Sequence, residues 1–418
     1  MSNFKIVETL LYVRDQKAST RFYSQMKKIK LIILIFIEIG CSDLMIGQNV
    51  NPSNRYVDEY KKYENAAVPL IKDSIKHFVY FARDRELIHN HVFLKTEWFK
   101  GAQIMYPWSV LEPQKGVYDF SVIEEDYEYL KLFGKKLFIQ FQDATFNPKF
   151  KAVPEYLLTD EFDGGVTPQY KDNGQVEGWV AKRWNPNVQK RLALLLKMLG
   201  EKFDGKIEGI NFQESSISVN NKSDKSFSPD KYVESLKINM LALKKAFPNS
   251  TTMQYANFMP DEWLPGNDKG YLRSIYKYGQ KIGVGLGAPD LMVNKRGQLN
   301  HALAMMHEGI FDVPLGIAVQ DGNFSGSTGL AEKLENGKPS AGHKNIVPML
   351  HSFAKDFLRV KYMFWSNGDP YFNIDLIPVI GEDNTLSYQK FPLFLGGTWK
   401  VEGQELYEHW DIINEKGF

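Results

Sequence analysis

The sequence predicts one (β/α)8 barrel, a closed ring of eight parallel strands with helices on its outside. From residue 77 onward, short apolar runs alternate with longer amphipathic stretches, and eight such runs can be counted. Eight strands spread over about 300 residues are typical of this fold. A doubly wound open sheet is the alternative. That fold usually has a Gly-rich phosphate-binding turn after its first strand, whereas this chain has FARDREL at 81–87.

The eight expected strands each hold a few consecutive apolar residues. They are HFVYFA (77–82), GAQIMYPW (101–108), KLFIQFQD (136–143), IEGINFQE (207–214), TTMQYANF (251–258), IGVGLGAPD (282–290), VPLGIAVQD (313–321) and VKYMFWSN (360–367). Helical periodicity is clearest at 122–134 and 188–203, although Gly200 weakens the second helix. The loop at 144–186 is long, and loops of that length in a compact domain are usually functional.

The amino-terminal region has the pattern of an export signal. Residues 26–40, MKKIKLIILIFIEIG, join a basic start to an apolar run too short to span a bilayer comfortably. We therefore expect a signal at 26–48 and an exported protein, either periplasmic, secreted or held at the cell surface by a lipid on Cys41. Cleavage near Gly47 is an alternative to the lipid anchor, and a buried strand or helix is an alternative to the signal.

Residues 1–25 precede this signal. Their ETLLYVRD (8–15) and ASTRFYSQ (18–25) resemble the first strand and helix of the vicinal-oxygen-chelate, or glyoxalase-like, family. We interpret them as a stray fragment without function, with Met26 as the true start. The remaining boundaries are a helical lead-in at 49–76, the barrel at 77–380, and a last helix or packing tail at 381–418.

Composition narrows the class of function. The 51 basic and 50 acidic residues leave a net charge of +1, without the basic excess of a nucleic-acid binder. The single cysteine, Cys41, excludes an intrachain disulfide and a cysteine metal site. The eight histidines show no HExxH and no other tight ligand spacing, so we expect neither a metal nor a cofactor. Aromatic residues make up 14% of the chain, which is high, and flat apolar rings stack on sugars as well as filling cores.

The expected strands end in carboxylates, amides and aromatics. In this fold the carboxyl ends of the strands surround the active site. Glycoside hydrolysis needs two carboxyl groups, one to protonate the leaving oxygen and one to attack the sugar or activate water. A carbohydrate is therefore the expected partner. The strand-end residues are Tyr106, Trp108, Gln140, Gln142, Asp143, Gln213, Glu214, Tyr255, Asn257, Asp290, Gln320, Asp321, Trp365 and Asn367.

One stretch also resembles a known family. Residues 98–143, WFKGAQIMYPWSVLEPQKGVYDFSVIEEDYEYLKLFGKKLFIQFQD, resemble the second and third strand units of the retaining TIM-barrel glycoside hydrolases, the cellulase, xylanase and β-galactosidase superfamily. The marks are Trp108, LEP, Gly116, YDF and GKKLFIQ. The resemblance makes 207–214 the fourth strand and implies that Glu214 is the acid/base, with Gln213 in place of the usual Asn. It also implies that Trp365 stacks on sugar.

The seventh expected strand departs from that family, since it ends in Gln320 and Asp321 where the family has a nucleophilic Glu. Asp321 is the candidate nucleophile or base, and Asp143 or Asp290 is a base for an inverting mechanism. The alternative is an inactive barrel that binds carbohydrate. A lyase or a metal-dependent isomerase would need His, Lys or metal ligands at the strand ends, which are absent there.

The other strand-end residues are expected to bind substrate. We expect Trp108 to stack on sugar, and Gln142, Gln213, Tyr255 and Asn257 to hold hydroxyl groups. Asp143, Asp290 and Gln320 complete the expected lining. Trp179 and Trp184 in the long loop are candidates for outer stacking platforms, and Glu112 is expected to anchor its loop.

Overall fold

The computed structural model describes residues 52–67, 70, 72–171, 173–320, 323, 346–368 and 371–380. The predictions for the fragment 1–25, the signal 26–48 with Cys41, the tail 381–418 and Asp321 lie outside the described residues.

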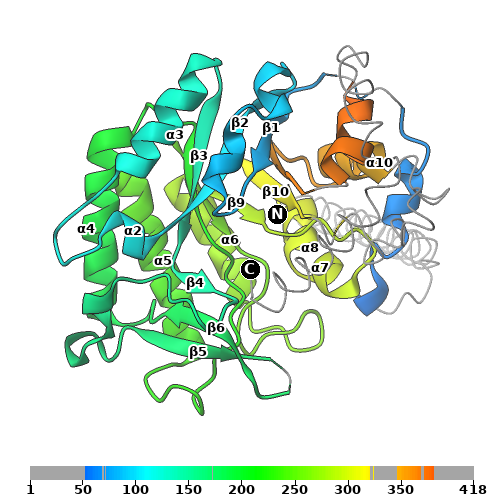
Figure 1. The fold of residues 1–418 in the computed structure, drawn as a ribbon. Helices are drawn as coiled ribbons and strands as arrows, with labels where there is room; N and C mark the ends of the chain where they lie inside the picture. Colours follow the sequence, from blue (N-terminus) through cyan, green and yellow to red (C-terminus); the bar gives the residue numbers. More distant parts are fainter. Residues whose placement is uncertain are drawn as a thin grey trace, which may run out of the picture. The chain divides into compact units, whose positions relative to one another are not determined.

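The centre of the fold is a closed barrel of eight strands (Figure 1), which confirms the predicted fold class. Every neighbouring pair of strands is parallel. Each of the eight expected runs forms one of these strands. They are β1 (Lys76–Tyr80), β2 (Phe99–Pro107), β3 (Lys136–Gln142), β7 (Gly209–Phe212), β8 (Thr251–Tyr255), β9 (Gly285–Ala288), β10 (Leu315–Val319) and β11 (Tyr362–Ser366).

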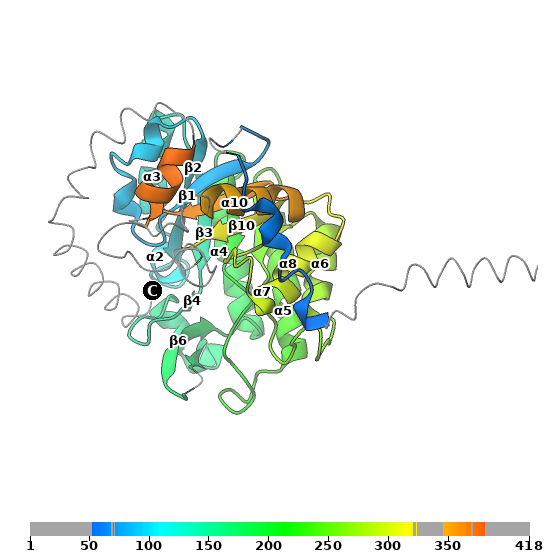
Figure 2. The same cartoon turned by 90° about the vertical axis from the view of Figure 1, so that its right-hand side faces the viewer.

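Helices connect the strands and cover the outside of the barrel (Figures 1 and 2). Asn185 and Ser228 begin the two longest helices with side chains that accept backbone N–H bonds, and a proline follows each as the first helical residue. The helices are α2 (Trp108–Leu111), α3 (Ser121–Leu132), α4 (Pro186–Phe203), α5 (Pro229–Ala246), α6 (Tyr271–Ile282), α7 (Arg296–Asn300), α8 (Ala302–Glu308) and α10 (Ile346–Ser352). Shorter 3-10 and π turns cover 52–54, 59–63, 85–88, 92–95, 155–158, 160–162, 353–357, 372–376 and 377–379.

The barrel interior is an apolar plug of aromatic side chains. Successive residues of a strand point to opposite sides, so alternate residues of each strand face inward. The rings of Phe78, Phe138 and Phe364 meet there edge to face, with 5.8 Å between the first two centroids and 4.9 Å between the last two. The inner cluster is Phe78, Phe138, Met253, Tyr255, Ala318, Tyr362 and Phe364. Because this plug closes the centre of the barrel, any site must lie above it, at the strand ends.

The long loop after β3 forms a small antiparallel sheet. It consists of β4 (Ala144–Thr145), β5 (Val166–Tyr170) and β6 (Val176–Ala181) in the order β4-β6-β5. The three strands lie together beside the barrel in Figure 1. Since β4 follows directly on the end of β3, this sheet belongs to the end of the barrel where the strands terminate.

The predicted helical lead-in is wrong for most of its length. Within the described part of 49–76, only Pro52–Asn54 and Glu59–Tyr63 are helical, as short 3-10 turns. Tertiary contacts override the local propensity here, because the Leu70 N–H donates to the Val379 carbonyl (2.7 Å) and Ile75 is buried in the core. The expected helices at 122–134 and 188–203 are confirmed as α3 and α4, within two residues at each end.

Gly200 is required by the packing of α4 on α5. A Cβ atom at this position would lie 2.0 Å from the Ala246 carbonyl oxygen, so the two helices approach too closely for any side chain. The helix-weakening glycine seen in the sequence therefore serves a tight helix contact.

We expect Gly200→Ala to destabilise the protein by about 1–3 kcal/mol, because overpacking outweighs the better helix propensity of alanine. The midpoint of urea unfolding measures this. Gly266→Ala is the matched control, since a Cβ there meets nothing within 4 Å, and its midpoint should stay near that of the wild type. Equal midpoints for the two variants would contradict the close contact.

Candidate active site

Glu214 lies just past the end of β7, at the mouth of the barrel. Its side chain is half-buried, and Asn257, which follows β8, donates a hydrogen bond from Nδ2 to the Glu214 Oε2 at 2.6 Å. The Asn257 Oδ1 accepts from the Ser216 N–H at 3.1 Å, which fixes the amide orientation. The structure thus brings together two residues that the sequence predicted for the site.

The surroundings of Glu214 favour its protonated form. Burial raises the pKa of Glu214 from an ordinary value of 4.5 to about 7, against the opposing effect of the Asn257 hydrogen bond. The negative charges of Asp290 and Glu177 raise this pKa further, and Arg183 lowers it. A carboxyl group that is partly protonated near neutral pH is suited to donate a proton.

Asp290 supplies a second carboxyl close enough to act on Glu214. It follows β9 and is half-buried, and burial raises its pKa, opposed by a hydrogen bond from Asn323 Nδ2 to its Oδ1 at 3.3 Å. The charge of Asp290 is among the causes that raise the pKa of Glu214, whereas burial is what raises the pKa of Asp290. An ionised Asp290 therefore favours the protonated form of Glu214.

Asp143 is engaged in a buried ion pair with Arg183. Both side chains are about 5% exposed, and the guanidinium contacts the two carboxylate oxygens at 2.8 and 2.6 Å. Arg183 also donates to the Glu214 carbonyl at 3.1 Å and to the Tyr232 hydroxyl at 2.8 Å. Tyr232 in turn donates to the Ser215 carbonyl at 2.9 Å. Asp143 thus positions the backbone of Glu214, and its role as a base is not supported by this geometry.

The three predicted glutamines differ in their contacts. Gln213 accepts the backbone N–H groups of Asp143 (3.0 Å) and Ala144 (2.9 Å), so it joins the ends of β3 and β7. Gln142 is buried, and its Oε1 has no hydrogen-bond partner among the described residues. Gln320 is half-buried at the end of β10, and its backbone N–H donates to Asn323 Oδ1 at 2.8 Å. Of these, Gln142 has an open acceptor.

A polar layer lies on top of the aromatic plug, and the sequence prediction missed most of it. Tyr255 lies there, with its hydroxyl accepting from Gln103 Nε2 at 3.2 Å, and the same amide donates to Asn211 at 2.9 Å. Tyr80 donates to Gln140 Oε1 at 3.1 Å. Burial is the main cause that raises the pKa of the Tyr80 hydroxyl, and the charges of Glu214 and Asp290 raise it further. These residues form the floor beneath Glu214.

The two tryptophans predicted to stack on sugar are core residues. Trp365 is fully buried on the outer face of β11, in the layer between strands and helices, and its Nε1 donates to His77 Nδ1 at 3.1 Å. Trp108 is also fully buried, and its Nε1 donates to Glu112 Oε2 at 3.0 Å. Glu112 further accepts from Tyr156 and the Gly116 N–H, which confirms that it anchors its loop.

The two tryptophans of the long loop, Trp179 and Trp184, lie in different environments. Trp184 is buried against Phe227, with its Nε1 on the Ser226 hydroxyl at 2.9 Å, so it is not a platform. Trp179 on β6 is half-buried, and Lys151 covers its ring at 4.5 Å from the centroid. Glu177, two residues earlier on β6, is the residue of this sheet whose charge reaches Glu214.

One group of described residues has the composition of a metal site. Asp73, His77 and His351 hold candidate ligand atoms within 4.8 Å of one another, beside the start of β1 and not at the strand ends. The Trp365 N–H occupies the Nδ1 lone pair of His77, so the neutral ring carries its proton on Nε2. His351 Nε2 lies 3.2 Å from Asp73 Oδ2. A protonated His77 Nε2 cannot ligate a metal, so the donor set does not fit a metal centre, and His351 Nε2 has no hydrogen-bond partner among the described residues.

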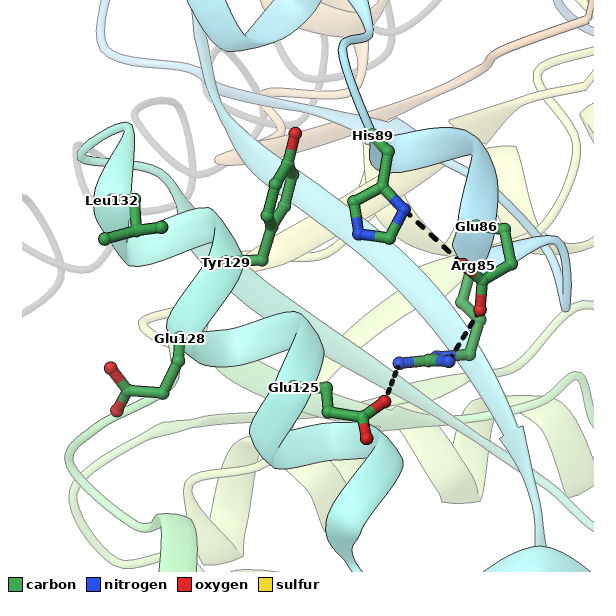
Figure 3. A pocket seen from close by; sticks show the side chains of 7 residues that line it. All are labelled: Arg85, Glu86, His89, Glu125, Glu128, Tyr129 and Leu132. Carbon is green, nitrogen blue, oxygen red and sulfur yellow. Dashed lines mark hydrogen bonds and ion pairs between the residues drawn. The ribbon is translucent and has the colours of Figure 1, made fainter.

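A surface hollow of about 470 Å³ lies between the 85–88 turn and α3 (Figure 3). Its charged groups pair with each other, with Arg85 contacting Glu86 and Glu125 at 2.7 and 2.8 Å. None of the residues predicted for the site lines it. Within the described part of the chain, no helix is both long and apolar enough to cross a membrane.

Among the comparisons with known proteins, only the comparison with solved structures found chains similar to this one. No family model matches the chain. No curated protein matches it either. Similar solved structures include the catalytic domain of a β-amylase from Paenibacillus polymyxa, with 9% identity over 71% of this chain and 93% of that one, at a TM-score of 0.47. A xylanase from Paenibacillus barcinonensis has 13% identity over 80% and 92%, at 0.41. An endo-glycoceramidase from Rhodococcus sp. has 11% identity over 73% and 74%, at 0.43. Similarity at this level does not establish an activity for this chain.

Removing one member of the buried Asp143–Arg183 ion pair should lower the stability of the folded protein. We expect Asp143→Asn to destabilise the protein by about 3–5 kcal/mol, because it leaves the buried Arg183 charge without its partner. Urea unfolding measures the loss. Glu201→Gln, which removes one partner of the exposed pair with Lys197, is the control and should leave the midpoint nearly unchanged. A small loss for Asp143→Asn would show that water compensates Arg183.

The raised pKa of Glu214 predicts a pH-dependent stability. Between 4.5 and about 7 the folded state binds more protons at Glu214 than the unfolded state, so this residue lowers stability as the pH rises through that window. Glutamine does not titrate. The melting temperature of Glu214→Gln relative to wild type should therefore be higher at pH 8 than at pH 4.5. A difference that stays constant over this range would mean an ordinary pKa.

Proposed function

We propose that this protein is a glycoside hydrolase acting on a poly- or oligosaccharide, with Glu214 as the general acid. One observation carries the proposal, namely the half-buried Glu214 at the barrel mouth, held by Asn257 and facing the charge of Asp290, with a pKa raised to about 7. Hydrolysis of a glycosidic bond requires such a proton donor at the leaving oxygen together with a second, ionised carboxylate.

Asp290 is the second carboxylate in this proposal. The mechanism requires Asp290 to be ionised while Glu214 holds its proton, and burial raises the pKa of Asp290, which makes its ionised form a stronger base toward water. Asp290 would take a proton from water as that water attacks the anomeric carbon, while Glu214 gives its proton to the departing oxygen. The bond from the anomeric carbon to the leaving oxygen breaks, the bond to water oxygen forms, and the product has inverted configuration.

The polar floor suits the binding of sugar hydroxyl groups in this proposal. The Gln142 Oε1 acceptor is open, and Tyr80 and Gln140 lie beneath the two acids. Each buried acceptor without a partner gains from a hydroxyl donor, because leaving it unsatisfied costs free energy. No metal or cofactor takes part in any step of this proposal.

A second candidate function is a barrel that binds carbohydrate without cleaving it. The observation in its favour is Gln320 at the end of β10, since a neutral amide forms no glycosyl-enzyme ester. Export to the cell surface or beyond, by the signal at 26–48, remains part of both proposals.

The test compares variants on two kinds of substrate. Wild type is screened for release of reducing ends from xylan, β-glucan, mannan and starch, and for release of dinitrophenol from the matching aryl glycosides. Glu214→Gln should lose about 10²–10⁴-fold on the polysaccharide. It should lose much less on the dinitrophenyl glycoside, whose leaving group needs no proton. Asp290→Asn should lose activity on both.

The controls separate the alternatives. Glu201→Gln, on the exposed face of α4, should keep full activity. If Asp321→Asn loses activity on both substrates while Asp290→Asn does not, the base is Asp321. Binding of a polysaccharide without release of reducing ends by wild type would favour the non-catalytic barrel. Proton NMR of the first product anomer tests inversion.

The pH profile gives a further prediction. Since Glu214 must hold its proton, activity should fall as the pH rises through about 7. Asp290→Asn removes a charge that raises the pKa of Glu214, so the alkaline limb of its residual activity should move to lower pH. An alkaline limb that stays in place would show that another group titrates there.

A further inference from the structure

A pair of stacked aromatic rings, of which one is exposed, lies at the same end of the barrel as Glu214. Phe258 directly follows Asn257, the residue bonded to Glu214, in the loop between β8 and α6. The ring of Phe258 stacks on that of Trp263 in the same loop, with 5.7 Å between centroids and 9° between planes. We call Phe258 and Trp263 the aromatic platform.

Trp263 keeps most of its surface in water. Its side chain is 60% exposed although Phe258 and His301 contact it, the latter at 4.9 Å between centroids. The Trp263 ring also lies against α7. Its Cη2 atom is 3.5 Å from the position that a Cβ atom on Gly297 would take. The platform therefore bridges the loop after β8 and the segment after β9 that carries Asp290.

The loop holds the exposed ring in a fixed position. The Trp263 and Asn267 backbones exchange two hydrogen bonds, at 3.0 and 2.7 Å. The Leu264 N–H donates to the buried His301 Nε2 at 2.9 Å. Glu262 is buried and accepts from the first N–H groups of α6, Tyr271 at 2.6 Å and Leu272 at 3.1 Å. A ring fixed in advance loses little entropy when a ligand covers it.

We propose that the aromatic platform binds a pyranose ring of a glycan chain, outside the position of the sugar whose bond is cleaved. The inference rests on the proposed function and specifies its substrate, a polysaccharide or long oligosaccharide that extends across the mouth toward Trp263. The apolar C–H face of a sugar covers an exposed indole face and removes it from water. Charged side chains that pair with each other around the ring, Asp261 with Lys269 and Asp268 with Arg273, leave the platform itself as the apolar surface of this loop.

The test measures binding and catalysis separately. Glu214→Gln is the background for affinity electrophoresis in gels containing xylan, β-glucan, mannan or amylopectin, so that the probe is not degraded. Adding Trp263→Ala should weaken retention by about tenfold in the gel that retards the background protein, and Trp263→Phe should restore part of it. Phe133→Ala is the matched control, an exposed aromatic after α3 at the opposite end of the barrel, and should not change retention.

Steady-state kinetics test the platform independently of the binding assay. In the otherwise wild-type protein, Trp263→Ala should raise KM for the polysaccharide about tenfold and leave kcat/KM for a dinitrophenyl monosaccharide glycoside unchanged. Retention equal in the Trp263→Ala and background proteins, or no retention in any gel, overturns the platform. Loss of retention on Trp263→Ala without any hydrolysis by wild type supports the platform and overturns the hydrolase.

Discussion

The buried pair of Asp143 and Arg183 is the contact on which the site depends. It joins the end of β3 to the segment before α4, and the same guanidinium binds the Glu214 carbonyl and the Tyr232 hydroxyl of α5. Burial lowers the pKa of Arg183, but Asp143 and Tyr232 together more than compensate, so the net pKa is raised and the charge is kept. A buried pair of this kind stabilises little on balance, yet it fixes geometry because neither charge tolerates separation. The Asp143–Arg183 pair therefore fixes the course of the backbone after Phe212, the last residue of β7, and with it the position of the Glu214 side chain.

The interior of the barrel is built in two layers with opposite chemistry. Below, the phenylalanine rings of β1, β3 and β11 exclude water. Above, amides and tyrosine hydroxyls hold one another, as Gln103 does with Asn211 and Tyr255. A carboxyl placed over this floor loses hydration from below, which is why burial is the largest cause of the raised pKa of Glu214. The raised pKa of Glu214 thus follows from its depth in the barrel, and the Asn257 hydrogen bond limits how far this pKa rises.

The strands were predictable from sequence because eight apolar runs carry a strong local signal, and each became a barrel strand. The side of the strand to which each single side chain points was not predictable from sequence. Trp365 and Phe364 are neighbours on one strand with opposite directions, and a run of buried residues on both faces gives no alternation to set the phase. Residues held by distant partners also escaped prediction, since Arg183 and Trp263 lie in loops without periodicity. Glu214, Asn257 and Asp290 could be predicted because each lies two residues past the end of a strand.

The placement of the second carboxyl explains how a barrel with Gln320 on β10 can still hold two acids. Asp290 follows β9, the neighbour of β10 in the ring, and Asn323 connects the two by donating to Asp290 and accepting from the Gln320 N–H. The Asn323 amide thus fixes Asp290 from the side of the β10 end. In the proposed mechanism a water molecule lies between the two acids, and this water can adapt its position to both.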